Sequence, residues 1–264
     1  MVRRMVALVS AFRPDSCVVA EVRPSPNHGE RKLGGKPDMI VLHYTGMADT
    51  AAALAKLCVP GSEVSTHYVV MEDGYIFQCV PEARRAWHAG AAAWEGESDI
   101  NSCSIGIEIA NPGHSHGYPD FPKRQIAAVT TLCRSIFTRY RIPAWRVLGH
   151  SDVAPTRKQD PGEKFPWRVL HDAGIGLWVK PAPIIPGGPI FVLGENDPAI
   201  AEIQALLDKY GYDIPASGSY DGPTRDVIAA FQRHFRPALV DGVADTSTIA
   251  TIRSLLAARA AQGD

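Results

Sequence analysis

The chain has 264 residues, enough for one large domain with a small one or for two of moderate size. Its composition, 45% hydrophobic and 21% charged, is that of a globular protein and excludes a disordered or fibrous chain. The formal net charge is -1, so no overall basic field exists and nucleic acid is not an expected partner. No apolar run approaches the ~20 residues of a membrane helix, so no membrane span is expected.

The N-terminus and the cysteines bear on the compartment. Arg3 and Arg4 precede an apolar stretch at residues 5–12, which resembles a signal peptide but is short and lacks a small-residue cleavage site. The five cysteines are odd in number and include no C-x-x-C pair, which favours free buried thiols over a disulfide framework. Both observations favour a cytoplasmic protein, with the periplasm or cell envelope as the alternative.

The N-terminal part of the chain mixes strand and helix patterns. Residues 39–42 form a continuous apolar run that predicts a buried strand, and residues 66–70 and 75–80 predict two more around a turn at residues 72–74. A helix ending before Pro143 is predicted from apolar residues at steps of three and four, namely Ile126, Val129, Cys133, Ile136, Phe137 and Tyr140. The predicted fold class is α/β, with a mixed central sheet flanked by helices.

A proline- and glycine-rich segment predicts a domain boundary. Residues 180–189 contain four prolines and two glycines, which exclude a helix and a central strand. We therefore predict a domain at residues 1–180, a linker at 181–189 and a second domain at 190–264. The sequence of this second domain predicts helices only. We expect it to fold separately, because such a linker carries few contacts.

The second domain contains a short internal repeat. Asp197 is predicted to cap its first helix, with Pro198 in the first turn. The pattern G-x-x-D-x-x-T occurs at residues 218–224 and again at 242–248, each time before an apolar stripe of helical spacing. Turn and helix are thus duplicated, which predicts a small all-α domain of three helices.

The densest polar stretch of the chain is at residues 149–162. It contains His150, Lys158 and Asp160, although taken alone it is equally typical of a solvated loop. His43 closes the predicted strand at 39–42, where α/β sheets place active-site groups, even though a lone histidine there is more often structural. Together His43, His150 and Asp160 form an N,N,O set that suits tetrahedral Zn²⁺ with a fourth position open to water.

Residues 102–111 predict a strand with two different faces. Ile105, Ile107 and Ile109 alternate with small residues around a single carboxylate, Glu108. A face of this kind is expected on the floor of a site that leaves room for a substrate. The alternative is an ordinary half-exposed strand with a solvated glutamate.

These segments resemble the zinc-dependent N-acetylmuramoyl-L-alanine amidases, whose domain is shared with phage amidase lysozymes and peptidoglycan recognition proteins. The resemblance covers roughly residues 20–178 and rests on five ordered motifs, at residues 41–45, 65–68, 86–90, 101–111 and 149–162. It implies that zinc is bound by His43, His150 and Asp160. It also implies that Glu108 is the general base and that Lys158 stabilises the oxyanion.

The implied reaction is hydrolysis of the amide between N-acetylmuramic acid, or its 1,6-anhydro form, and the L-alanine of peptidoglycan stem peptides. The implied partners are peptidoglycan fragments or anhydro-muropeptides, and we expect a monomer. Tyr44, His67, Trp87 and Asn111 are expected to contact the substrate, with a structural role as the alternative for His67. His88 is expected to pack or to line the cleft, and the histidines at 114 and 116 to lie on a substrate-side loop rather than in a second metal site.

The residues after Pro189 resemble a peptidoglycan-binding domain. The resemblance rests on Ile203-Gln204, Phe231-Gln232 and residues 240–242, while aspartates at 221 and 245 stand where the family usually has glycine. It therefore implies the fold more firmly than it implies glycan binding. Two other functions use the same residues: a noncatalytic peptidoglycan-recognition module, against which the complete ligand set argues, and a phage-type lytic enzyme that shares the chemistry.

Overall fold

The computed structural model describes residues 12–32 and 35–263. The signal-like stretch at residues 5–12 therefore lies outside the described residues, except for Phe12. Within the described ranges, no helix is both long and apolar enough to cross a membrane. The cysteines are free, and Cys79 and Cys133 are buried, but Cys17 is exposed, so the expectation of buried thiols is only partly correct.

A six-stranded mixed sheet forms the centre of the N-terminal part, in the order β1-β5-β4-β7-β3-β8. β5 runs antiparallel to β4, and the other neighbouring pairs are parallel. A separate two-stranded sheet pairs β2 with β6. The strands are β1 (Glu21–Val22), β2 (His28–Glu30), β3 (Met39–Tyr44), β4 (Tyr68–Val70), β5 (Ile76–Gln78), β6 (Arg84–Ala86), β7 (Ser104–Ile109) and β8 (Val147–Gly149). The predicted α/β class with a mixed sheet is confirmed.

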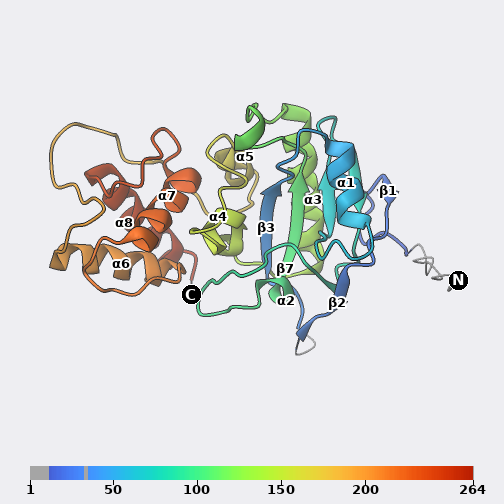
Figure 1. Ribbon diagram of the computed structural model, residues 1–264, viewed down its shortest axis with the longest axis horizontal. Coiled ribbons are helices and arrows are strands. Elements are labelled where there is room, and N and C mark those ends of the chain that lie inside the picture. Colours follow the sequence, from blue (N-terminus) through green and yellow to red (C-terminus); the bar gives the residue numbers. More distant parts are fainter. Residues whose placement is uncertain (1–11, 33–34, 264) are drawn as a thin grey trace, which may run out of the picture.

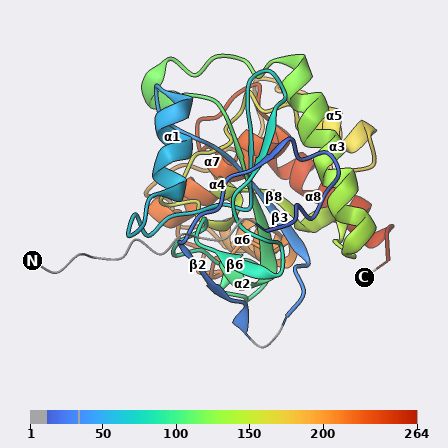
Figure 2. The same cartoon turned by 90° about the vertical axis from the view of Figure 1, so that its right-hand side faces the viewer.

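The two faces of the sheet are covered by different elements. On one face, helix α3 (Lys123–Arg139) packs Ile126 and Val129 against alternate residues of the central strands, such as Leu42 and Ile107. On the other face, helix α1 (Thr50–Cys58) packs on the outer strands through Leu54 and Leu57. Figure 2 shows α1 and α3 on opposite sides of the strands. The face that α3 does not cover is the face of His43.

The parallel strands bring the predicted site residues to one end of the sheet. The register pairs His43 of β3 with Glu108 of β7, and Leu42 of β3 with Gly149 of β8. Helix α4 (His150–Val153) begins directly after β8, so His150 lies at the same end of the sheet as His43. The strand predicted from residue 102 begins instead at Ser104, because residues 100–103 form the short helix α2 (Ile100–Cys103).

The C-terminal part is a bundle of three helices, α6 (Pro198–Tyr210), α7 (Gly222–Phe235) and α8 (Thr246–Ala260). Asp197 caps α6 as predicted, accepting a hydrogen bond from the Ala199 amide at 2.7 Å. In the two repeats, Asp221 and Asp245 cap α7 and α8 by accepting from the amides of Thr224 and Thr248 at 2.9 and 2.7 Å. The aspartates of the repeat therefore stabilise helix starts.

The bundle packs closely against the N-terminal part, although the linker itself is largely exposed. Trp94 is 0% exposed, and its ring lies 5.6 Å and 5.0 Å from the rings of Tyr210 and Tyr212, centroid to centroid. One apolar cluster includes Val41 of the sheet together with Phe231 of α7. The expectation of few contacts between the two parts is therefore wrong, because linker composition says nothing about the surfaces on either side.

A buried carboxylate joins the bundle to helix α4. Asp152 is 1% exposed and accepts hydrogen bonds from the Gly149 amide, the Tyr212 hydroxyl and the His234 Nδ1, each at 2.7 Å. The His234 ring is stacked on Trp167 of α5 (Trp167–Asp172), 3.6 Å away between centroids. In Figure 1, α7 lies beside α4. Hydrogen bonds from the bundle therefore help to fix the position of helix α4, which begins with His150.

We predict that a chain ending at Lys180 will be insoluble or will unfold at a markedly lower temperature than the full chain. The truncation exposes the Trp94 ring and removes two of the three hydrogen-bond donors of Asp152. In the full chain, Trp94→Ala should lower the free energy of unfolding by about 3 to 5 kcal/mol, the usual cost of emptying a buried aromatic site. Thermal and denaturant unfolding measure both effects.

Ile185→Ala is the matched control, because this linker side chain is 65% exposed. Its effect should stay within about 0.5 kcal/mol, as for most surface changes. A soluble truncated chain with the melting temperature of the full protein would contradict the prediction.

Candidate active site

A cleft of about 480 Å³ opens at the ends of β3 and β7. His43 and Glu108 project into it from these strands, His150 from α4, and Lys158 and Asp160 from the loop that follows α4. The structure therefore brings together all five residues that the sequence proposed for metal binding and catalysis.

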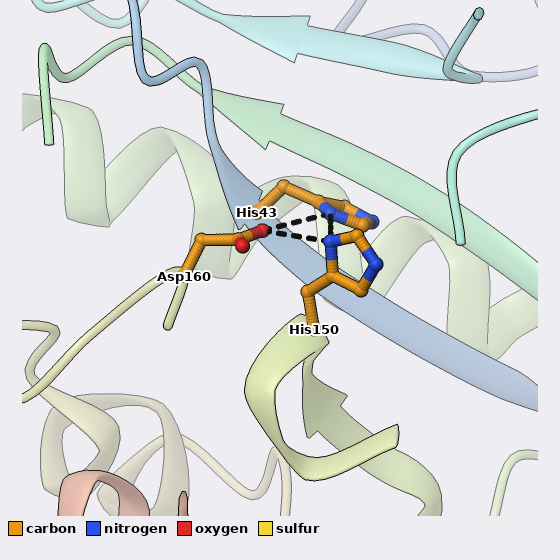
Figure 3. Close-up of side chains that lie close together, drawn as sticks. All are labelled: His43, His150 and Asp160. Atoms are coloured by element: carbon orange, nitrogen blue, oxygen red, sulfur yellow. Dashed lines mark hydrogen bonds and ion pairs between the residues drawn. The ribbon is translucent and has the colours of Figure 1, made fainter. Parts of the chain in front are cut away.

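Three donor atoms converge inside this cleft (Figure 3). The Nδ1 atoms of His43 and His150 are 2.9 Å apart, and each lies 3.0 Å from Oδ2 of Asp160. The three residues are 1%, 3% and 6% exposed. In the part of the chain that the structure describes, this is the one group of at least three His, Cys, Asp or Glu side chains close enough to hold a metal ion.

The protonation of these groups makes the cluster a cation site. His150 Nε2 donates to the carbonyl oxygen of Ala89 at 2.9 Å, which leaves a lone pair on Nδ1. Burial and the neighbouring His150 lower the pKa of His43 to about 4, so its ring is neutral. Burial opposes ionisation of Asp160, but its contacts with the two imidazoles outweigh burial and hold its pKa well below the usual range. Three donor atoms this close to one another require a cation among them, either a proton on an imidazole, which lowers the pKa of Asp160, or a metal ion.

The donor set fits zinc. Two imidazole nitrogens and one carboxylate oxygen are typical ligands of catalytic zinc, which keeps a fourth position open. Ligand distances of about 2.0 to 2.2 Å in a tetrahedron place donor atoms ~3.3 Å apart. The 2.9 and 3.0 Å separations found here need only a small expansion to accept the ion.

Glu108 and Lys158 lie in the same cleft. Oε2 of Glu108 is buried and has no hydrogen-bond partner among the described residues. Burial, and next the charge of Asp160, raise the pKa of Glu108 well above its usual value. No hydrogen bond or ion pair of the Lys158 ammonium is found in the described ranges. The cleft thus offers a proton acceptor and a cation that are both free to act on a bound molecule.

Two of the four predicted substrate contacts lie on the cleft surface. Tyr44 and Trp87 both line it. The Tyr44 hydroxyl is 3.0 Å from Nδ1 of His114, whose Nε2 is 3.1 Å from Oε2 of Glu163. His114 lines the cleft from a short 3-10 helix, His114–His116, which agrees with the predicted position on the substrate side.

The side chains of the other two predicted substrate contacts, His67 and Asn111, bind the protein's own backbone. His67 is 0% exposed, its Nδ1 accepts from the Gly106 amide, and its Nε2 donates to the carbonyl of Arg84, both at 3.0 Å. The Asn111 side chain is occupied by the backbone of residues 113 and 119. Neither residue lines the cleft, and both support the backbone around the site, which for His67 is the alternative expected from the sequence.

His88 lines the cleft as expected, but the sequence did not predict its contact with the metal-binding cluster or the contacts of Arg157 beside it. Nε2 of His43 lies 3.0 Å from Nδ1 of His88. The Arg157 guanidinium donates to the carbonyls of Ala89 and Ala91 at 2.6 and 2.7 Å. The motif at residues 86–90 is visible in the sequence, but a sequence motif does not indicate which of its backbone or side-chain atoms face a ligand.

Comparison with known proteins agrees with this geometry. The family described as N-acetylmuramoyl-L-alanine amidase matches residues 33–163, and the putative peptidoglycan binding domain matches residues 196–252. The N-acetylmuramoyl-L-alanine amidase AmiD of Escherichia coli K12 is 38% identical over 234 residues, which cover 83% of this chain and 82% of that protein. The chain belongs to the N-acetylmuramoyl-L-alanine amidase family. The expected family and hydrolase activity are confirmed.

Further relatives extend the likeness to the fold. The 1,6-anhydro-N-acetylmuramyl-L-alanine amidase AmpD of Citrobacter freundii is 34% identical over 168 residues, covering 56% of this chain and 88% of that protein. A structure of E. coli AmiD with the substrate anhydro-N-acetylmuramic acid-L-Ala-D-γ-Glu-L-Lys has a TM-score of 0.71 at 36% identity, covering 86% and 91% of the two chains. AMPDH3 of Pseudomonas aeruginosa has a TM-score of 0.70 at 32% identity, covering 85% and 92%.

We predict that the metal-free protein will bind about one zinc ion per chain. Asp160→Asn should weaken zinc binding by one or more orders of magnitude, because it removes the anionic donor while leaving the shape of the side chain. Competition with a chromophoric chelator measures the affinity, and metal analysis gives the stoichiometry. Asp120→Asn is a suitable control on an exposed loop. Equal zinc affinity in Asp160→Asn and the wild type would contradict the assignment.

Proposed function

We propose that this amidase is a zinc hydrolase with His43, His150 and Asp160 as ligands, Glu108 as general base and Lys158 as oxyanion stabiliser. Its substrates are peptidoglycan fragments in which N-acetylmuramic acid, or its 1,6-anhydro form, is joined to L-alanine. The observation behind the proposal is the convergence of three donor atoms in one cleft, beside a carboxyl group and an ammonium that have no partner among the described residues. The anhydro-muramyl ligand named with the AmiD structure supports the substrate class.

The residues of the cleft divide the reaction between them. Zinc, when bound, supplies Lewis-acid chemistry that polarises a carbonyl and makes water a stronger acid. Glu108 takes a proton from the attacking water as the carbon–oxygen bond forms. It then gives the proton to the alanine nitrogen as the carbon–nitrogen bond breaks. Lys158 offsets the negative charge that develops on the carbonyl oxygen.

The domain division, compartment and oligomeric state belong to the same proposal. We propose an amidase domain at residues 1–180 and a peptidoglycan-binding domain at 190–264, joined by a linker at 181–189, in a monomer. Free cysteines favour the cytoplasm, whereas a peptidoglycan-binding domain favours the cell envelope. Fractionation of cells that express the protein from its own start codon, with a sedimentation assay on purified sacculi, tests compartment and glycan binding together.

We predict that Glu108→Gln will lower kcat on a muramoyl-peptide by a factor on the order of 10² to 10⁴, the usual contribution of a general base. Zinc content should be unchanged, because the ligand set is intact. Product formation by chromatography and metal analysis of the same sample measure the two effects. Loss of zinc in this variant would mean that Glu108 belongs to the ligand set. Muropeptide binding without turnover in the zinc-loaded wild type would favour a recognition module.

We predict that Lys158→Ala will lower kcat by a factor on the order of 10² to 10³ while changing ground-state binding little. The charge that Lys158 offsets is fully developed only near the transition state, so KM and zinc content should remain close to those of the wild type. Lys123→Ala is the control, because this exposed lysine begins α3 on the far face of the sheet. A Lys158→Ala enzyme with wild-type kcat would remove the oxyanion role.

A further inference from the structure

His88 lies beside the metal-binding cluster and has no part in the proposed reaction. It follows β6, and its ring meets the His43 ring edge to face, with centroids 5.1 Å apart and an interplanar angle of 81°. Its Nδ1 is 3.0 Å from Nε2 of His43, and its Nε2 is 3.1 Å from the hydroxyl oxygen of Ser104. His88 therefore bridges a proposed zinc ligand and the first residue of β7.

The directions of the hydrogen bonds that link His43, His88 and Ser104 follow from the acceptor at the end of the series, the carbonyl oxygen of Ile100. The carbonyl of Ile100 can only accept, so the Ser104 hydroxyl donates to it at 2.5 Å. The Ser104 oxygen then accepts from Nε2–H of His88. A neutral imidazole has one N–H, so Nδ1 of His88 accepts from Nε2–H of His43. This leaves the lone pair of His43 on Nδ1, the atom that faces His150 and Asp160.

The backbone around His88 is shaped to hold the ring in this place. A Cβ atom at Gly106 of β7 would lie 2.5 Å from Cγ of His88, so only glycine leaves room for the ring there. The side-chain oxygen of Asn101 accepts from the amides of His88 and Ala89 at 3.0 and 2.9 Å. The carbonyl of Ala89 in turn accepts from His150. Two adjacent residues therefore orient both ligand imidazoles.

We propose that His88 is a positioning residue of the zinc site, which fixes the tautomer and ring orientation of His43 so that Nδ1 points at the ion. The inference rests on the proposed zinc function. Hydrogen-bond partners of ligand histidines commonly contribute 10- to 100-fold to metal affinity. If His88 only filled space, zinc affinity would not depend on a hydrogen-bond acceptor at the place of its Nδ1.

The test measures zinc affinity by chelator competition for the full-length protein and its variants. We expect His88→Ala to bind zinc about 10- to 100-fold more weakly than the wild type. His88→Asn should regain most of this loss, because its carbonyl oxygen can occupy the place of Nδ1 and accept from His43. His88→Gln should regain less, because its amide reaches past that place toward Ser104.

His116→Ala is the matched control, because this histidine is exposed on the 3-10 helix and lies outside the metal-binding group. Thermal unfolding of the zinc-free proteins reports whether each variant is folded. Wild-type zinc affinity in folded His88→Ala would overturn the inference. If that variant does not fold, equal affinities of the Asn and Gln variants would overturn it. A wild type that binds no zinc would instead overturn the proposed function.

Discussion

The parallel pairing of β3 with β7 and β8 is the constraint on which the site depends. It places His43 opposite Glu108 and ends β8 at Gly149, directly before His150. With Asp160 contributed by the loop after α4, two imidazoles and a carboxylate lie within 3.0 Å of one another in a buried place. Burying these polar groups together costs free energy, which the apolar packing on both faces of the sheet must offset.

The C-terminal bundle is part of this support. Asp152 lies two residues after His150, and its oxygens are shared between the start of α4 and the bundle residues Tyr212 and His234. The apolar cluster on the His43 face of the sheet continues into the bundle without a break. A peptidoglycan-binding domain docked in this way has a fixed orientation relative to the cleft, unlike a domain attached only through a flexible linker.

The sequence was sufficient where the signal is local. The strand at 39–42, the alternation around Glu108 and the Asp197 cap depend on neighbouring residues, and the structure has them as expected. It was insufficient where partners are distant in the chain. The histidine at position 67 binds the backbone of β7, whereas the histidine at position 88 is a partner of His43. Residue type alone does not distinguish these two roles.

The two carboxyl groups of the cleft, Asp160 and Glu108, differ in their surroundings and therefore in their pKa values. Asp160 lies between two imidazoles, which stabilise its charge and lower its pKa. Oε2 of Glu108 is buried and has no partner among the described residues, and burial together with the charge of Asp160 raises the pKa of Glu108. Environments that push two pKa values apart divide acid–base roles between groups of one kind. The ionised group is thus suited to hold a cation and the other to carry a proton, a difference that residue type alone does not contain.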